Sequence, residues 1–232
     1  MITVQTGDKL YPYAAKRCEC RVRRIIEKAI SAVPSELGVP KLMELQPAKD
    51  LHPVASYARH IENVQAQAIR AMQAAPFDDY LFCGENGTGK THMAYALYLH
   101  ALFAGHRVVA CTVQELLDEF KSMELGKSGK DGQPFRARIV PEDLRQNSEK
   151  WTVLIDDFVQ ARVTEFTCEM LCALLDAAWK YGHQLIVTSN KNVDDLIERW
   201  SRVDEVYGRT MAKRLTAKCM CVELFFDGLS SQ

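Results

Sequence analysis

The feature that most constrains this chain is an eight-residue segment that matches the pattern G-x-x-x-x-G-K-[ST] without a mismatch, Gly84-Glu85-Asn86-Gly87-Thr88-Gly89-Lys90-Thr91. A run that reads as a strand, Asp79–Cys83, precedes it, and an amphipathic helical run follows it. Glycines allow such a loop to curl until its N–H groups face phosphate oxygens, and the following helix N-terminus adds to the attraction. We therefore expect these residues to bind ATP or GTP, with Lys90 at the β- and γ-phosphates and the Thr91 hydroxyl on Mg²⁺. The alternative is a glycine turn without a ligand, which the complete match and its flanks disfavour.

The composition is that of a globular protein rather than a disordered one. Of its 232 residues, 47% are hydrophobic and 25% are charged. The net charge of −1 gives no overall attraction to nucleic acid, so any such binding must come from local patches. No apolar run reaches the roughly 18–20 residues that span a bilayer, and the first residues lack the apolar stretch of a secretory signal. We expect a cytoplasmic protein that does not enter membranes. Most of its cysteines lie in apolar segments and should be buried thiols: Cys83, Cys111, Cys168, Cys172, Cys219 and Cys221.

From Asp79 onward, apolar runs alternate with amphipathic ones. We expect strands at Tyr80–Cys83, Val108–Thr112, Thr152–Asp156, Leu185–Thr188 and Met220–Phe226. We expect helices at Lys90–Ala104, Val113–Lys121, Cys168–Tyr181, Val193–Arg202 and Thr210–Ala217. This alternation predicts an α/β fold, a five-stranded parallel sheet flanked by helices on both faces.

The first part of the chain has a less regular pattern. Arg17–Ala32 should form a helix with an apolar stripe, and prolines then interrupt the chain up to a second helix, Val54–Ala75. We divide the chain into a small, mostly helical N-terminal segment (1–52) and an ATPase domain (53–232). A glycine-rich connection from Met123 to Lys150 should be a loop with a short helix after Pro141.

Two carboxylates follow the apolar segment Thr152–Ile155. If this strand ends beside the phosphate loop, Asp156 can hold Mg²⁺ through water, and Asp157 can orient the attacking water as a general base. The alternative is a buried strand with polar residues at its exposed end. The order and distance of the two motifs favour the catalytic interpretation.

A polar tip also ends the segment Leu185–Asn190. Asn190 is the candidate to sense the γ-phosphate or position the water, because its strand should neighbour the other two. The alternative is a helix cap for the residues that follow, since Asn and Ser are good caps.

Four segments in this order resemble the helicase-loader branch of the AAA+ ATPases, namely the DnaC and DnaI loaders and the IstB transposition helper: YLFCGENGTGKTHMAYAL, TVLIDDF, LIVTSN and MAKRL. The resemblance covers the chain from Val54 to Phe226. It implies an AAA+ P-loop NTPase fold with ATP and Mg²⁺ as cofactors. It also implies that Arg214, with Arg209 in reserve, completes the ATP site of a neighbouring subunit; the alternative is that both arginines only solvate a helix.

The sequence departs from this family in its last strand and its first helix. The segment VELFFDGLSSQ contains no arginine, so the second nucleotide sensor of the family is either missing, in which case weak turnover is expected, or supplied from elsewhere. We also expect no full lid domain. Relatives of the DnaI type can bind zinc through two cysteine pairs in their N-terminal domain. The N-terminal segment of this chain has only Cys18 and Cys20, so we predict no zinc.

The resemblance implies an ATP-dependent loader of a replicative hexameric helicase of the DnaB type onto single-stranded DNA, with self-association through the ATP interface. The alternatives are an IstB-like transposition helper that acts on duplex DNA and a non-hydrolysing ATP-binding adaptor. Basic residues of the first helix and of the glycine-rich connection (Lys121, Lys127, Lys130, Arg136 and Arg138, beside Phe135) either contact DNA or are a solvated surface. We expect the apolar stripe of the first helix to bind a protein partner; the alternative is packing on the ATPase domain.

Overall fold

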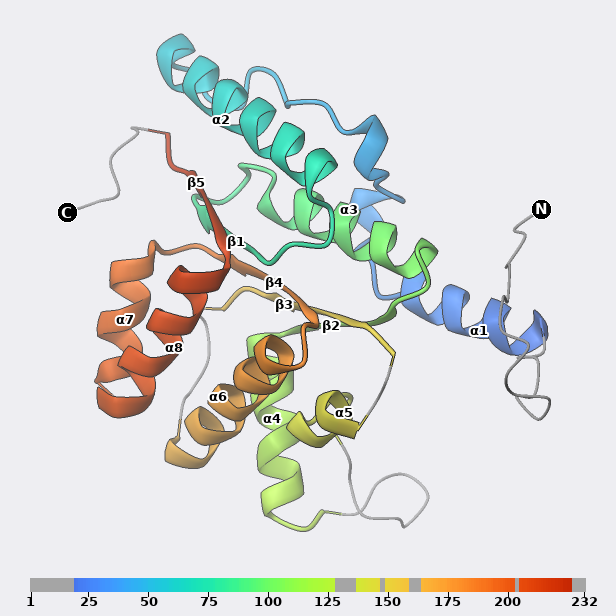
Figure 1. The fold of residues 1–232 in the computed structure, drawn as a ribbon. Coiled ribbons are helices and arrows are strands. Elements are labelled where there is room, and N and C mark those ends of the chain that lie inside the picture. The colour runs from blue at the N-terminus through green and yellow to red at the C-terminus, as the bar shows by residue number, and fades with distance from the viewer. Residues whose placement is uncertain (1–18, 128–136, 147–148, 159–163, 203–204, 227–232) are drawn as a thin grey trace.

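The centre of the molecule is a parallel sheet of five strands in the order β2-β3-β4-β1-β5 (Figure 1). A computed structural model describes residues 19–127, 137–146, 149–158, 164–202 and 205–226. The strands are β1 (Tyr80–Gly84), β2 (Arg107–Thr112), β3 (Trp151–Asp156), β4 (Gln184–Ser189) and β5 (Met220–Leu224). All four pairings between neighbours are parallel. The predicted α/β fold with a five-stranded parallel sheet is therefore confirmed.

Helices cover both faces of this sheet (Figure 1). On one face lie α1 (Glu19–Ile30), α2 (Ala55–Ala74) and α3 (Lys90–Phe103), together with two short 3₁₀ helices, η1 (Ser35–Leu37) and η2 (Leu42–Glu44). On the other lie α4 (Val113–Glu124), α5 (Pro141–Gln146), α6 (Glu165–Lys180), α7 (Val193–Ser201) and α8 (Glu205–Lys218). Successive strand residues serve opposite layers: Leu81 packs with α4 to α8, whereas Tyr80 and Phe82 pack with α1 to α3. Both faces of the sheet are thus buried, as a parallel sheet requires.

The helix and strand bounds agree closely with expectation except near the end of the chain. The helix expected from Thr210 begins at Glu205, so it runs through Gly208. An added Cβ at Gly208 would lie 2.4 Å from the backbone nitrogen of Ser201, so glycine is present because α7 and α8 approach closely. The last strand ends at Leu224 rather than at Phe226.

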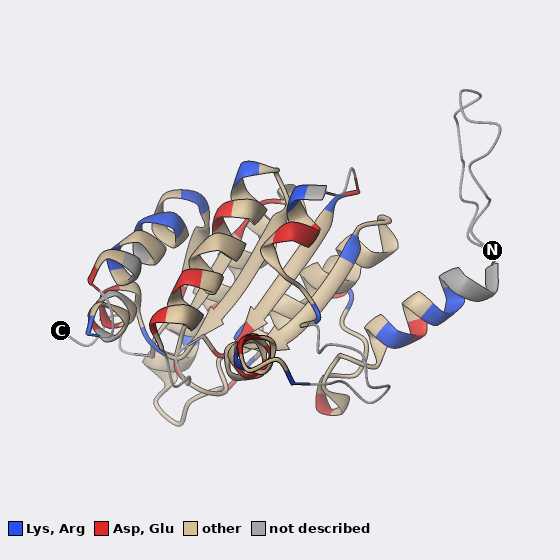
Figure 2. Cartoon of the chain, turned by 90° about the horizontal axis from the view of Figure 1, so that it is seen from below, with Lys and Arg blue, Asp and Glu red and all other residues tan. Residues whose placement is uncertain are grey.

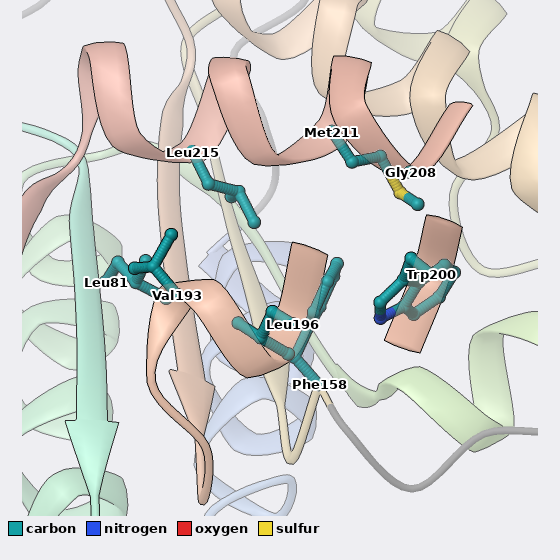
Figure 3. Close-up of a pocket in the computed structure, with 8 residues that line it drawn as sticks. All are labelled: Leu81, Phe158, Val193, Leu196, Trp200, Gly208, Met211 and Leu215. Carbon is teal, nitrogen blue, oxygen red and sulfur yellow. The ribbon is translucent and has the colours of Figure 1, made fainter. Parts of the chain in front are cut away.

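A small apolar cavity lies where α7 and α8 meet the sheet (Figure 3). Leu81 of β1 and Phe158 face side chains from both helices, including Leu196, Trp200 and Met211. Phe158 and Trp200 stack with ring centroids 5.2 Å apart. This packing joins the α7–α8 pair to β1 and to the residues that follow β3.

The apolar stripe of α1 packs on the rest of this chain. Ala29 is buried, Ile26 and Ile30 pack against the cluster formed with α2 and α3, and the Tyr98 hydroxyl donates to the Ala29 carbonyl at 3.3 Å. Only Ile25 remains largely exposed among the described apolar residues of the helix. The expectation that this stripe is left for a protein partner is therefore wrong for its C-terminal half, because α3 and β2 supply the missing apolar surface.

Five of the cysteines expected to be buried are buried, and Cys221 is exposed at the edge strand β5. Cys18, the first member of the pair considered for zinc, lies outside the described residues. Within the described part of the chain, the helices are too short or too polar to cross a membrane.

Candidate nucleotide-binding site

The segment between β1 and α3 forms a curled loop closed on itself. Gly87 and Gly89 have φ values of 80° and 84°, a conformation that glycine adopts without the strain of a side chain. The Thr88 hydroxyl and the Lys90 ammonium both donate to the Glu85 carbonyl, at 2.8 and 2.6 Å. These two bonds hold the second half of the loop, at the N-terminus of α3, against the Glu85 carbonyl near its start. In a loop curled in this way before a helix N-terminus, backbone N–H groups can bind anions.

Lys90 is the buried cation of this loop, with 6% of its surface exposed. Burial lowers the pKa of its ammonium, and the charges of Asp156 and Asp157 act in the opposite direction. The loop thus contains a buried ammonium that can donate to phosphate oxygens and whose charge the two carboxylates partly balance.

Asp156 ends β3 next to the first turn of α3. The Thr91 hydroxyl donates to Asp156 Oδ1 at 3.3 Å, and the Thr188 hydroxyl of β4 donates to the same oxygen. The sequence assigned Thr91 and Asp156 jointly to Mg²⁺, and the structure brings these two groups together. Hydroxyl and carboxylate oxygens are the hard ligands that Mg²⁺ prefers.

Asp157 follows in a left-handed conformation, with φ of 57°. Its N–H donates to Thr188 Oγ1 at 3.0 Å, and its carboxylate accepts from Asn190 Nδ2 at 3.0 Å. Burial raises the pKa of this carboxyl, the neighbouring Asp156 raises it further, and Lys90 lowers it. A carboxylate whose proton affinity is raised is suited to accept a proton from water.

Asn190 therefore lies in the site, and the helix cap is a different residue. The N-cap of α7 is Asn192, whose side chain accepts from the Asp195 N–H at 2.8 Å. The alternative considered for Asn190 from the sequence is excluded, and its amide is held by Asp157 instead.

Two residues of this site were not identified from the sequence. Thr188, 2% exposed, links Asp156 to Asp157 from the adjacent strand. Gln65 of α2 donates to the Thr88 carbonyl at 2.8 Å. A signal for Gln65 existed: it is the polar member of a buried stripe that continues through Ile61, Ala68 and Met72.

Arg214 of α8 is not among these groups in its own chain. Its Nε pairs with Asp176 of α6, and its side chain is 22% exposed. Arg209, the reserve candidate, pairs with Glu205 at 2.6 Å and is largely exposed. A role in a neighbouring subunit stays a prediction for both.

The basic residues considered for DNA contact differ in their surroundings. Arg23, Arg24 and Lys28 are exposed along α1, which extends from the body of the molecule (Figure 2). Arg138 pairs with Glu119 at 2.7 Å and with Glu115 at 3.3 Å, so its charge is balanced within the chain. Lys130, Phe135 and Arg136 lie outside the described residues.

The residues present fit a magnesium-bound nucleotide. The loop offers curled backbone amides and a buried cation. The ends of β3 and β4 bring Asp156 Oδ1 within hydrogen-bonding distance of the Thr91 and Thr188 hydroxyls, and Asp157 Oδ1 within that of the Asn190 amide. The carboxyl ends of β1, β3 and β4 meet here because β4 lies between β1 and β3. Open parallel sheets bind ligands at this edge.

Comparisons with known proteins agree with this geometry. Residues 45–230 match the family model of the IstB-like ATP binding protein. An ATP-binding protein of insertion sequence IS5376 from Geobacillus stearothermophilus is 25% identical over 160 residues, which are 66% of this chain and 57% of that protein. The chain thus spans less than two thirds of that relative's length.

Solved structures of three proteins share the fold. DnaI and the DnaC helicase loader each give a TM-score of 0.57, at 15% and 16% identity, covering 82% of this chain and 94% and 99% of theirs. AMPPCP-bound DnaA from Aquifex aeolicus gives a TM-score of 0.55 at 15% identity, covering 81% of this chain and 50% of that one. At such identities the likeness concerns the arrangement of helices and strands.

Proposed function

Because the chain belongs to the family of IstB-like ATP-binding proteins and has an AAA+ fold, we propose that it hydrolyses ATP at the carboxyl ends of β1, β3 and β4. The backbone of Gly84, Glu85, Asn86, Gly87, Thr88 and Gly89 holds the phosphates. Lys90 leaves the Glu85 carbonyl and donates to the β- and γ-phosphate oxygens. Thr91 and Asp156 hold Mg²⁺, which supplies charge neutralisation on the phosphates.

The second carboxylate and its amide partner act on the attacking water. Asp157 accepts a proton from the water, and its raised pKa makes it a better base than an exposed carboxylate. Asn190 donates to Asp157 Oδ1, which fixes the direction of the carboxylate and leaves its second oxygen for the water.

The observation that carries this proposal is the convergence of Lys90, Thr91, Asp156, Asp157 and Asn190 from separate elements at one edge of the sheet. Phosphate release with ATP and magnesium is the direct test. We expect Asp157→Asn to bind MgATP like the parent and to lose turnover. A parent protein that binds MgATP without releasing phosphate, alone or with single-stranded DNA and helicase, would instead be the non-hydrolysing adaptor.

The cellular role we favour is the loading of a DnaB-type replicative helicase onto single-stranded DNA. ATP assembles subunits side by side, and Arg214 of one subunit reaches the phosphates bound by the next. Support comes from the order and the residues of the four motifs, and the fold shared with the DnaC helicase loader is compatible with the role. In this proposal the segment 1–52 contacts the helicase, through the exposed basic face of α1 rather than its buried stripe.

A transposition helper is the second candidate, because the curated relative belongs to an insertion sequence. One experiment separates the two roles. The protein is mixed with MgATP and either a DnaB-type hexamer or labelled duplex DNA, and complexes are measured by sedimentation and fluorescence anisotropy. Capture of the hexamer supports the loader. Cooperative, salt-sensitive coating of duplex DNA without capture of the hexamer supports the helper.

A further inference from the structure

Gln65 is a buried polar side chain on the apolar face of α2. It is 3% exposed and lies in line with Ile61, Ile69 and Met72, which are also buried. Burying a side-chain amide is costly unless both of its ends are hydrogen-bonded. An apolar residue would suit this position better if packing were its only role.

Both ends of the Gln65 amide are bonded, and to different parts of the chain. Its Oε1 accepts from the Ala48 N–H at 2.6 Å, and its Nε2 donates to the Thr88 carbonyl at 2.8 Å. Turning the amide over would set its NH₂ against an N–H and its oxygen against a carbonyl. The two bonds therefore fix one orientation of the amide.

The bond to Thr88 also fixes a peptide plane of the phosphate loop. The Thr88–Gly89 peptide is planar and trans, so its carbonyl and its N–H point in opposite directions. Holding the Thr88 carbonyl toward α2 turns the Gly89 N–H away from α2. Gly89, with φ of 84°, has no side chain to oppose rotation of this plane, and an added Cβ would lie 3.2 Å from Gln65 Nε2.

We propose that Gln65 is a positioning residue for nucleotide binding, which holds the Thr88–Gly89 peptide in its phosphate-binding orientation and couples that orientation to the chain around Ala48. The inference rests on the proposed function of the loop. A phosphate bound by the loop amides stabilises the same orientation of the Thr88–Gly89 peptide that Gln65 selects. Because Gln65 also accepts from the Ala48 N–H, this stabilisation extends to Ala48. Residues 45–50, which belong to the N-terminal segment (1–52), thus respond to nucleotide.

The test compares Gln65→Met with a matched control on the same helix. Gln73 of α2 also donates to a backbone carbonyl, that of Leu42 at 3.1 Å, without touching the phosphate loop. Dissociation constants for MgATP are measured by calorimetry on the full chain. Hydrogen exchange of residues 45–50 is followed with and without MgATP.

We expect MgATP to slow exchange of residues 45–50 in the parent and in Gln73→Met. In Gln65→Met this slowing should vanish, and the dissociation constant should rise about tenfold or more, the effect of losing one well-placed hydrogen bond. Gln65→Glu keeps the acceptor for Ala48 but faces Thr88 with a carboxylate oxygen, so it should weaken MgATP binding as well.

The inference is overturned if Gln65→Met binds MgATP like the parent, or if MgATP leaves exchange of residues 45–50 unchanged in the parent itself. The second measurement needs no variant, so a variant that fails to fold does not obscure the result. A parent protein that does not bind MgATP overturns the proposed function instead.

Discussion

Gly84 is the first residue of the phosphate loop, and we expect that no other residue can replace it. A side chain there would collide with β5, in addition to any effect on nucleotide binding. Its φ of 147° lies in the region open to glycine alone. A Cβ added there would lie 2.3 Å from the Leu224 carbonyl oxygen and 2.6 Å from its carbon. That same oxygen accepts the Glu85 N–H at 3.1 Å, so the two strands cannot separate without losing this bond.

The cost of Gly84→Ala has a conformational and a steric part. An alanine held in a glycine-only conformation costs about 1–3 kcal/mol. Forcing one carbon into a packed strand pair costs about another 1–3 kcal/mol. For a chain of this size a loss of about 2–6 kcal/mol lowers the unfolding temperature by about 5–20 °C.

Gly105→Ala is the matched control for this experiment. Gly105 has φ of 92°, and an added Cβ meets no atom within 4 Å. Gly105→Ala should therefore lower the free energy of unfolding only by the conformational part, about 1–2 kcal/mol. Thermal unfolding followed by circular dichroism, without nucleotide, measures both variants. If Gly84→Ala and Gly105→Ala unfold at the same temperature, the argument that a Cβ at Gly84 collides with β5 is refuted.

Three further predictions concern the chemistry of the site. Lys90→Ala should abolish MgATP binding in calorimetry, because the buried cation of the loop is lost; binding within a factor of about ten of the parent would contradict its role. Arg214→Ala should bind MgATP like the parent but release phosphate about a thousandfold more slowly once subunits are assembled; parent-like turnover would remove it as the arginine of the neighbouring site. In the nucleotide-free protein, burial and the neighbouring Asp156 raise the pKa of the Asp157 carboxyl above its ordinary value. The folded state holds this proton more tightly, so the stability it confers is complete below the ordinary carboxyl pKa and is lost as the pH rises through the raised one. Asp157→Asn should therefore unfold at pH 7 no earlier than the parent, since Asn also tolerates a φ of 57°; clearly earlier unfolding would contradict the assigned pKa direction.

The sequence predicted the sheet and the position of the site because both depend on local patterns. Strands buried on both faces are continuous apolar runs, and the phosphate loop is a contiguous segment with a fixed spacing. The ends of parallel strands meet at one edge, so Asp156, Asp157 and Asn190 could be grouped before their contacts were known. Their detailed partners could not, because Thr188 reaches Asp156 only through the pairing of β3 with β4.

Packing between distant segments accounts for the errors. The stripe of α1 was expected to need a partner because its own segment is short, yet most of α3 is apolar and buried, and α1 packs on it. The last helix was expected to begin at Thr210, whereas α8 begins at Glu205 and contains Gly208, where contact with α7 requires a glycine. In both cases the deciding atoms come from another element, so residue patterns within one segment could not reveal them.

The surroundings of Arg214 set a condition on its proposed role in a neighbouring subunit. Its Nη1 is buried without a hydrogen-bond partner among the described residues, and its Nε pairs with Asp176, whose side chain is 44% exposed. An ion pair at such a partly exposed site contributes about 0–1 kcal/mol, whereas a buried N–H without an acceptor costs about 1–3 kcal/mol. Swinging the guanidinium outward to a phosphate of the next subunit therefore gives up a weak pair and relieves an unsatisfied donor. The position of Arg214 against α6 is thus compatible with an arginine that pairs with Asp176 in the single chain and contacts the neighbour's phosphates only when subunits assemble.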